Sequence, residues 1–163
     1  MSYDDELMEI GDIGEKEFYK WATEKYGFDK VKYVGHENGK VDFFLNGTKV
    51  EIKTDTYINE TGNMVFEFCR LYLDPIKLMT GWGIASDSTL LFIYAIKTRE
   101  FIPIRFDVFR EITNKYIREN PKPNINVTPS DDNKIRWDKN HIKITFGLLI
   151  PKTYWENNIE EMP

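Results

Sequence analysis

The apolar positions near the start of the chain repeat at helical spacing. They are Leu7, Ile10, Gly14, Phe18, Trp21, Ala22 and Tyr26, which recur about every 3.6 residues. Gly27 follows directly and is a typical stop signal for a helix. The pattern predicts a helix over residues 4–26, with Gly11 and Gly14 weakening its middle, so that the first turns could form a separate short helix.

The spacing then changes to that of strands. Residues 40–45 and 48–54 flank Asn46-Gly47, the strongest short signal for a two-residue hairpin turn. The other predicted strands lie at residues 31–33, 64–70, 88–96, 101–106 and 141–150, and further helices at 107–119 and 154–161. A loop or short helix is predicted at 75–83, and a long loop with three prolines at 119–133. This order predicts an α/β fold of the mixed α+β type, with one domain over residues 1–163.

The hairpin turn fixes which side chains share a face. A two-residue turn pairs Phe43 with Val50, and Val41 with Ile52. All four are apolar, so this face of the hairpin is predicted to be buried.

The opposite face of the hairpin carries charges. Asp42 is predicted to lie opposite Glu51, and Lys53 follows Glu51 by two residues on the same face. Two opposed carboxylates repel each other, and a cation between them removes that cost. Hard oxygen ligands suit Mg²⁺ or Mn²⁺, and the adjacent ammonium can contact a phosphate or the attacking water. The alternative is a solvated strand face on which Lys40 and Lys53 neutralise the acids.

Composition narrows the class of protein. Hydrophobic residues make up 41% of the chain and charged residues 30%, as in soluble globular proteins. A single cysteine, Cys69, excludes an internal disulfide, and no apolar run approaches the length of a membrane helix. We therefore expect an intracellular, cytoplasmic protein without a membrane partner.

Charge is distributed unevenly along a chain of net charge −5. Residues 1–60 hold 14 acidic and 8 basic side chains, whereas residues 61–152 hold 10 acidic and 14 basic side chains. This distribution fits a carboxylate site beside a surface that contacts nucleic acid, although random scatter explains it equally well. The candidate phosphate contacts, as a group, are Arg70, Lys77, Arg99, Arg105 and Arg110.

Several short motifs together resemble the PD-(D/E)XK nuclease superfamily, which includes restriction enzymes, Holliday junction resolvases and phage nucleases. They are Gly11-x-x-x-Glu15 on the first helix, Asp42 in Val-Asp-Phe-Phe, and Val50-Glu51-Ile52-Lys53. Thr61-Gly62-Asn63 with Glu67, and Thr80-Gly81-Trp82 followed by Ser86-Asp87, are similar to small phage-type members. The sequence departs from the motif at Lys40-Val41-Asp42, where Pro-Asp gives the superfamily its name.

The resemblance implies a restriction endonuclease-like core, a mixed sheet flanked by helices, and assigns roles to individual residues. Asp42, Glu51 and the backbone carbonyl of Ile52 would bind Mg²⁺, with Mn²⁺ as a substitute. Lys53 would position the attacking water and offset charge in the transition state. Glu15 would support the site from the helix or bind a second ion, unless it is an ordinary exposed glutamate like Glu17. Glu67 either extends the carboxylate cluster or faces solvent.

The sequence thus leads to three hypotheses. The first is a metal-dependent endonuclease that acts on DNA, duplex or branched, as a homodimer and leaves a 5′-phosphate. The second is an inactive nucleic-acid- or protein-binding module on the same fold. The third is a phage protein that blocks a host factor.

Overall fold

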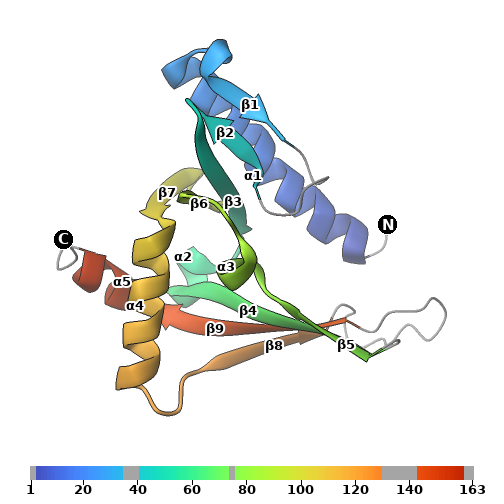
Figure 1. Ribbon diagram of the computed structural model, residues 1–163, viewed down its shortest axis with the longest axis vertical. Coiled ribbons are helices and arrows are strands. Elements are labelled where there is room, and N and C mark those ends of the chain that lie inside the picture. The colour runs from blue at the N-terminus through green and yellow to red at the C-terminus, as the bar shows by residue number, and fades with distance from the viewer. Residues whose placement is uncertain (1–2, 35–40, 74–75, 130–142, 160–163) are drawn as a thin grey trace.

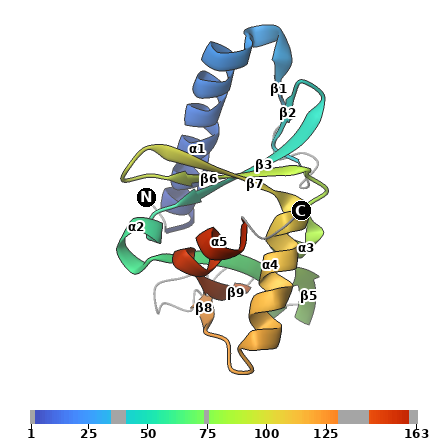
Figure 2. The same ribbon diagram turned by 90° about the vertical axis from the view of Figure 1, so that its left-hand side faces the viewer.

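Two β-sheets and the helices that cover them form the framework of the protein (Figure 1). The computed structural model describes residues 3–34, 41–73, 76–129 and 143–159. Helix α1 covers one face of a five-stranded sheet, sheet A, and a four-stranded sheet, sheet B, lies beyond the other face together with helices α4 and α5 (Figure 2). The fold is therefore mixed α/β, as the order of elements predicts.

Sheet A has the strand order β1-β2-β3-β6-β7 and sheet B the order β5-β4-β9-β8. The strands of sheet A are β1 (Val31–Tyr33), β2 (Phe43–Leu45), β3 (Thr48–Asp55), β6 (Leu90–Ala95) and β7 (Glu100–Arg105). Those of sheet B are β4 (Asn63–Leu73), β5 (Ile76–Thr80), β8 (Ile125–Pro129) and β9 (Lys143–Pro151). The helices are α1 (Tyr3–Tyr26), α2 (Ile58–Thr61), α3 (Trp82–Ala85), α4 (Phe106–Glu119) and α5 (Lys152–Ile159), with a short 3₁₀ helix η1 (Phe28–Lys30).

The connection between β3 and β6 joins the two sheets. These two strands pair in parallel, whereas the other strand pairs of the described residues are antiparallel. Parallel neighbours need a long crossover, and here it holds α2, β4, β5 and α3. Sheet B therefore starts inside the crossover, which places β4 and α3 next to the charged face of β3.

The predicted hairpin is confirmed. Phe43 pairs with Val50 and Leu45 with Thr48, and both Asn46 and Gly47 have positive φ, as a type I′ turn requires. The four side chains of the predicted apolar face are buried, namely Val41, Phe43, Val50 and Ile52. The turn chemistry and the alternation of side chains agree on one register.

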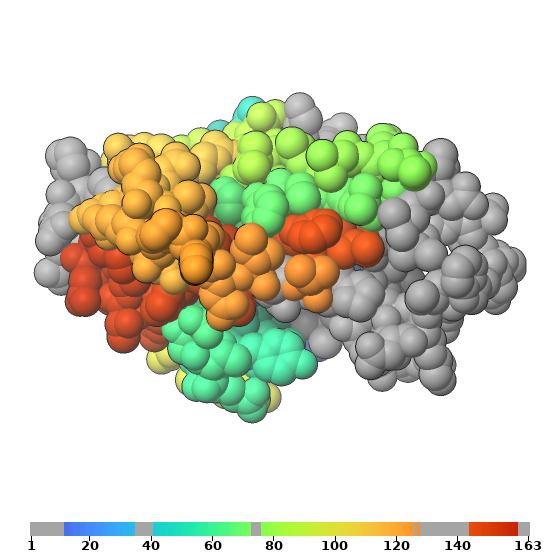
Figure 3. Space-filling model, turned by 90° about the horizontal axis from the view of Figure 1, so that it is seen from below, coloured from blue at the N-terminus to red at the C-terminus, as the bar shows by residue number. Residues whose placement is uncertain are grey.

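Each face of sheet A has its own hydrophobic core. The α1 side is filled by aromatic and aliphatic side chains around Phe18, whose ring lies 5.1 Å from that of Phe43 and 4.9 Å from that of Phe92. On the other side, Phe109 of α4 stacks on Trp155 of α5 at 4.6 Å. Aromatic rings at these separations add to the free energy gained by burial. Seen from below, the surface consists largely of α4, α5 and the strands of sheet B (Figure 3).

Helix α1 follows its predicted bounds and remains continuous through Gly11 and Gly14. It ends before Gly27, whose φ of 97° lies in the left-handed region that favours glycine. Within the described residues, no helix is long and apolar enough to cross a membrane.

Two predicted loops and one predicted strand start are wrong. The predicted loop or short helix at residues 75–83 contains a strand, β5, and the predicted loop at 119–133 contains β8. Both are edge strands of sheet B, where one neighbour supplies all the pairing and the sequence pattern is weak. The strand predicted from Lys40 begins at Phe43.

Gly14 allows α1 to approach β3 closely, because a Cβ atom there would overlap Thr54 Oγ1 and lie 3.3 Å from Thr54 Cβ. We expect Gly14→Val to lower the free energy of unfolding by about 1–3 kcal/mol, because the side chain overpacks this contact. Urea denaturation measures the loss. Lys20→Val, at an exposed position of the same helix, controls for the helix propensity of valine, and Thr54→Ala should recover part of the loss. No recovery would contradict this contact as the cause.

Candidate active site

The alternation of side chains along β3 places two charged groups on the face that looks toward sheet B. Val50 and Ile52 pack in the core beneath α1, so Glu51 and Lys53 point to the opposite face. Glu51 is in register with Leu91 of β6, and Lys53 with Ile93. Both of these neighbours belong to the second core, so the charged pair borders an apolar region.

Glu51 is a buried carboxylate that two side chains hold in place. Its residue is 5% exposed. Lys53 Nζ lies 2.5 Å from Glu51 Oε1, and Ser86 Oγ donates a hydrogen bond of 3.0 Å to Glu51 Oε2. Burial raises the pKa of Glu51, and the negative charge of Asp42 adds to the rise, which Lys53 and Ser86 only partly offset.

Lys53 is charged despite its surroundings. Burial by itself lowers its pKa, but the negative charges of Glu51, Asp42 and Glu67 and the hydrogen bond to Glu51 outweigh it, so the pKa of Lys53 is raised. Its Nζ lies 5.5 Å from the centre of the Trp82 ring, and its side chain remains 32% exposed. The ammonium can therefore reach a ligand while it neutralises Glu51.

Asp42 approaches β3 from the bend that precedes β2. Its N–H donates to the carbonyl of Val50 at 3.0 Å, and its Oδ2 accepts the N–H of Ile52 at 2.7 Å. The β2–β3 ladder ends at Phe43 and Val50, so Asp42 lies next to β3 without being a ladder partner of Glu51. Because the N–H and C=O of one strand residue point to the same side, the Ile52 carbonyl also points toward Asp42.

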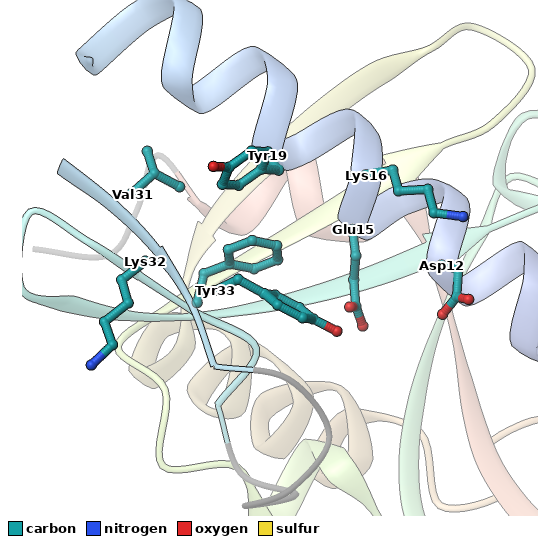
Figure 4. Close-up of a pocket in the computed structure, with 8 residues that line it drawn as sticks. Asp12, Glu15, Lys16, Tyr19, Val31, Lys32 and Tyr33 are labelled. Atoms are coloured by element: carbon teal, nitrogen blue, oxygen red, sulfur yellow. The ribbon is translucent and has the colours of Figure 1, made fainter. Parts of the chain in front are cut away.

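Glu15 points from α1 toward Tyr33 of β1 (Figure 4). A hydrogen bond joins its carboxylate to the Tyr33 hydroxyl. Burial, this bond and the negative charges of Glu15, Asp12 and Asp42 raise the pKa of Tyr33 to about 12. Glu15 and Asp12 line a groove of about 750 Å³ between α1 and β1, whereas Glu17 lines another pocket.

Glu67 lies on β4 of sheet B and faces the candidate site. It sits at an irregularity in the pairing of β4 with β9, and its Oε1 accepts hydrogen bonds from Arg70 Nε at 2.6 Å and from the N–H of Trp82 at 3.3 Å. Its charge also raises the pKa of Lys53. Only 12% of the Glu67 side chain is exposed, so the solvent-facing alternative is wrong.

Ser86 is a site residue that the sequence offered only as part of the pair Ser86-Asp87, without a role. It is buried, it follows α3, and it lies 35 positions from Glu51 in the chain. Arg110 of α4 holds this segment by donating hydrogen bonds to the carbonyls of Gly83, Ile84 and Ser86. The contacts of Arg110 fix the loop that orients Glu51.

Three of the arginines expected to contact phosphates have other partners. Arg110 binds backbone carbonyls, Arg70 pairs with Glu67, and Arg105 pairs with Asp107. Arg110 and Arg70 therefore bind groups within the structure, whereas Arg105 remains 61% exposed despite its ion pair. The two histidines of the chain, His36 and His141, lie outside the described residues.

The donor set fits a hard divalent cation. Within the described parts of the chain, no three His, Cys, Asp or Glu side chains form a metal cluster, but the predicted set needs only Asp42, Glu51 and the Ile52 carbonyl. The negative charge of Asp42 raises the pKa of Glu51, so the two carboxylates repel each other. Oxygen ligands of this kind suit Mg²⁺ and Mn²⁺. A bound cation would relieve the repulsion between the carboxylates of Asp42 and Glu51.

Asp42 provides a test of this geometry in the absence of metal. We expect Asp42→Asn to change the free energy of unfolding little, because the amide oxygen can still accept the Ile52 N–H and one charge near Glu51 is removed. Asp42→Ala leaves that N–H without its acceptor and should cost about 1–3 kcal/mol. Urea unfolding in EDTA distinguishes the two. Equal losses for both variants would contradict the hydrogen-bonding role.

Comparison with protein-family models, with curated proteins and with solved structures found no match to this chain. The resemblance to the PD-(D/E)XK superfamily therefore remains a prediction, which rests on the residues and the geometry of the site described above.

Proposed function

We propose that the protein is a metal-dependent nuclease that hydrolyses phosphodiester bonds in DNA. The observation that supports this most is the convergence of Asp42, Glu51 and Lys53 at β3. A buried carboxylate, a second carboxylate bound to the adjacent backbone amide and a protonated lysine meet at one place. Buried ionisable groups whose pKa values are shifted by neighbouring charges, here Glu51 and Lys53, are characteristic of functional sites.

The proposal includes the fold of a restriction endonuclease-like core within the mixed α/β architecture. In its favour, α1 packs on a sheet whose β2–β3 hairpin carries the acidic residues and Glu51-Ile52-Lys53. The close contact of Gly14 with Thr54 brings Glu15 to the edge of this hairpin.

In the proposed reaction, Asp42, Glu51 and the Ile52 carbonyl would hold Mg²⁺. The ion, when bound, would lower the pKa of a water molecule and offset negative charge on the phosphate. Ser86 keeps the Glu51 carboxylate oriented, and Trp82 shields one side of Lys53. The Lys53 ammonium moves its hydrogen bond from Glu51 to the attacking water or to a phosphate oxygen. In-line attack of the water on phosphorus then breaks the bond to the 3′ oxygen, which leaves as a hydroxyl after taking a proton from solvent, and the phosphate stays on the 5′ oxygen.

The charges of the site also bear on the alternative of an inactive binding module. A site that only binds nucleic acid gains nothing from Glu51, since a buried carboxylate near a phosphate opposes binding. The enclosed Glu51–Lys53 pair is costly to retain without a use. A nuclease has a use for both groups, and this difference favours catalysis.

Cleavage assays test the proposal directly. We expect the wild-type protein to cut labelled DNA with Mg²⁺ or Mn²⁺ but not in EDTA, on a panel of single strands, duplexes, flaps and four-way junctions. Lys53→Met and Glu51→Gln should each lower the rate about 100- to 1,000-fold, as expected for groups that stabilise the transition state. Lys49→Met removes an exposed lysine from the same strand and should leave the rate within about twofold.

The wild-type protein could instead cut none of these substrates with either metal, while the Lys53→Met and Glu51→Gln variants still bind DNA. That outcome would rule out the nuclease and favour the inactive binding module. Circular dichroism of each variant confirms that the fold is intact.

Metal binding provides a second test, independent of cleavage. We expect Mn²⁺ to raise the melting temperature of the wild-type protein, because a ligand that binds only the folded state stabilises it. Asp42→Ala should remove this response, whereas Glu60→Gln, at an exposed glutamate of α2, should keep it. Differential scanning calorimetry measures both. The same response in wild type and Asp42→Ala would rule out Asp42 as a ligand.

A further inference from the structure

A cleft of about 420 Å³ lies next to Lys53, between β3, α2 and the adjoining strands of sheet B. Lys53 and Asp55 form its β3 wall, Val65 of β4 and Leu149 of β9 form the opposite wall, and Trp82 lies beside them. The volume is within the range of about 300–1,000 Å³ that small-molecule sites occupy. The cleft therefore continues the candidate active site beyond Lys53.

The cleft arises from the way the chain leaves sheet A. The Asp55 carboxylate accepts the N–H groups of Tyr57 and Ile58 at 2.8 and 2.7 Å, which turns the chain away from β6 and into α2. Ile58 is buried in the core and anchors α2, and Gly62, with φ 65°, turns the chain back into β4 (Figure 2). The wall next to Lys53 is thus formed by a fixed turn.

The distribution of charge limits what the cleft can hold. Among the described residues that line it, Lys53 is the one cation, and Asp55 places a carboxylate further along the same wall. A phosphate is therefore favoured at the Lys53 end and disfavoured beside Asp55. Beyond Lys53, a ligand must be uncharged.

The remaining lining suits a flat heterocycle. Val65, Leu149 and Ile93 provide an apolar surface, and the carboxamide of Asn63 provides a polar contact. Tyr57 lines the same cleft and is 65% exposed, so its ring is accessible for stacking. Aromatic rings of this kind stack on nucleobases with little dependence on sequence.

We propose that this cleft binds the base of one unpaired nucleotide, attached to the phosphate that Lys53 contacts. The proposal rests on the nuclease function proposed above and defines its substrate class. A base inside a paired and stacked duplex cannot enter the cleft unless it leaves its stack. The substrate is therefore single-stranded DNA, or the unpaired segment of a flap or branch, rather than continuous duplex.

Binding measurements in EDTA test the subsite without cleavage. Fluorescence anisotropy is measured with a labelled 12-nucleotide oligothymidylate and with the same strand paired to oligoadenylate. Wild type should bind the single strand at least about fivefold more tightly than the duplex. Tyr57→Ala should weaken single-strand binding about 5- to 100-fold, the range that loss of stacking on one base implies, and should leave duplex binding unchanged. Tyr57→Phe keeps the ring and should bind as wild type.

Two controls make the result specific. Tyr26→Ala removes an exposed tyrosine at the end of α1, away from the cleft, and should have no effect. Asn63→Ala should weaken single-strand binding through loss of the polar contact. Unchanged single-strand affinity in both Tyr57→Ala and Asn63→Ala, or equal losses for single strand and duplex, would overturn the proposal.

Photo-crosslinking gives a further test that needs no variant. A single strand that carries 5-iodouracil should crosslink to Tyr57 or Trp82 of the wild-type protein, as peptide mass spectrometry would show. Crosslinks that form only elsewhere would overturn the subsite. Failure of the nuclease proposal has a different signature, since wild type would then bind the single strand through Tyr57 and yet cut nothing with Mg²⁺ or Mn²⁺.

Discussion

The side chain of Glu51 brings a carboxylate into the interior of the protein, and much of the surrounding structure compensates for that charge. Lys53 and Ser86 each contact one of its oxygens. Ser86 in turn belongs to a segment whose carbonyls are held by Arg110. A buried carboxylate without such partners would be costly, so β3, the α3 segment and α4 are tied together by the requirements of one group.

The parallel pairing of β3 with β6 has a second consequence. The long crossover that it requires carries β4 across the charged face of β3, and Glu67 with it. The three carboxylates of Asp42, Glu51 and Glu67 therefore converge on Lys53 and raise its pKa. A lysine that stays protonated beside a partly open cleft is suited to contact a phosphate, and this links the topology of the sheets to the proposed chemistry.

The two faces of sheet A have different roles. The face beneath α1 is filled with aromatic rings, which fix the helix and thereby Glu15. The other face is apolar at Leu91 and Ile93 but polar along β3, so the sheets separate there and leave the cleft beside Lys53. The candidate site thus lies on one side of β3, beside the second hydrophobic core.

Residues close together in the sequence were sufficient to predict the β2–β3 hairpin and helix α1. Asn46-Gly47 requires positive φ angles, and this turn fixes a register in which Phe43 and Val50 are buried and Glu51 and Lys53 face the other way. These features depend on neighbours in the sequence. The pairing of Asp42 with the Ile52 amide already departs from the simple ladder, because the chain bends before β2.

Only the tertiary structure decided the arrangement of sheet B, the full set of site residues and the cleft. Sheet B was not foreseen, because its two central strands, β4 and β9, are far apart in the sequence and pair only in the folded chain, and the segments that form its edge strands β5 and β8 were expected to be loops or a short helix. Ser86 and Glu67 join the site through contacts across the crossover, and Tyr57 and Asn63 line a cleft that exists only once β3 and β4 are in place. Short-range spacing specifies turns and alternation, whereas contacts between distant segments depend on how whole elements pack.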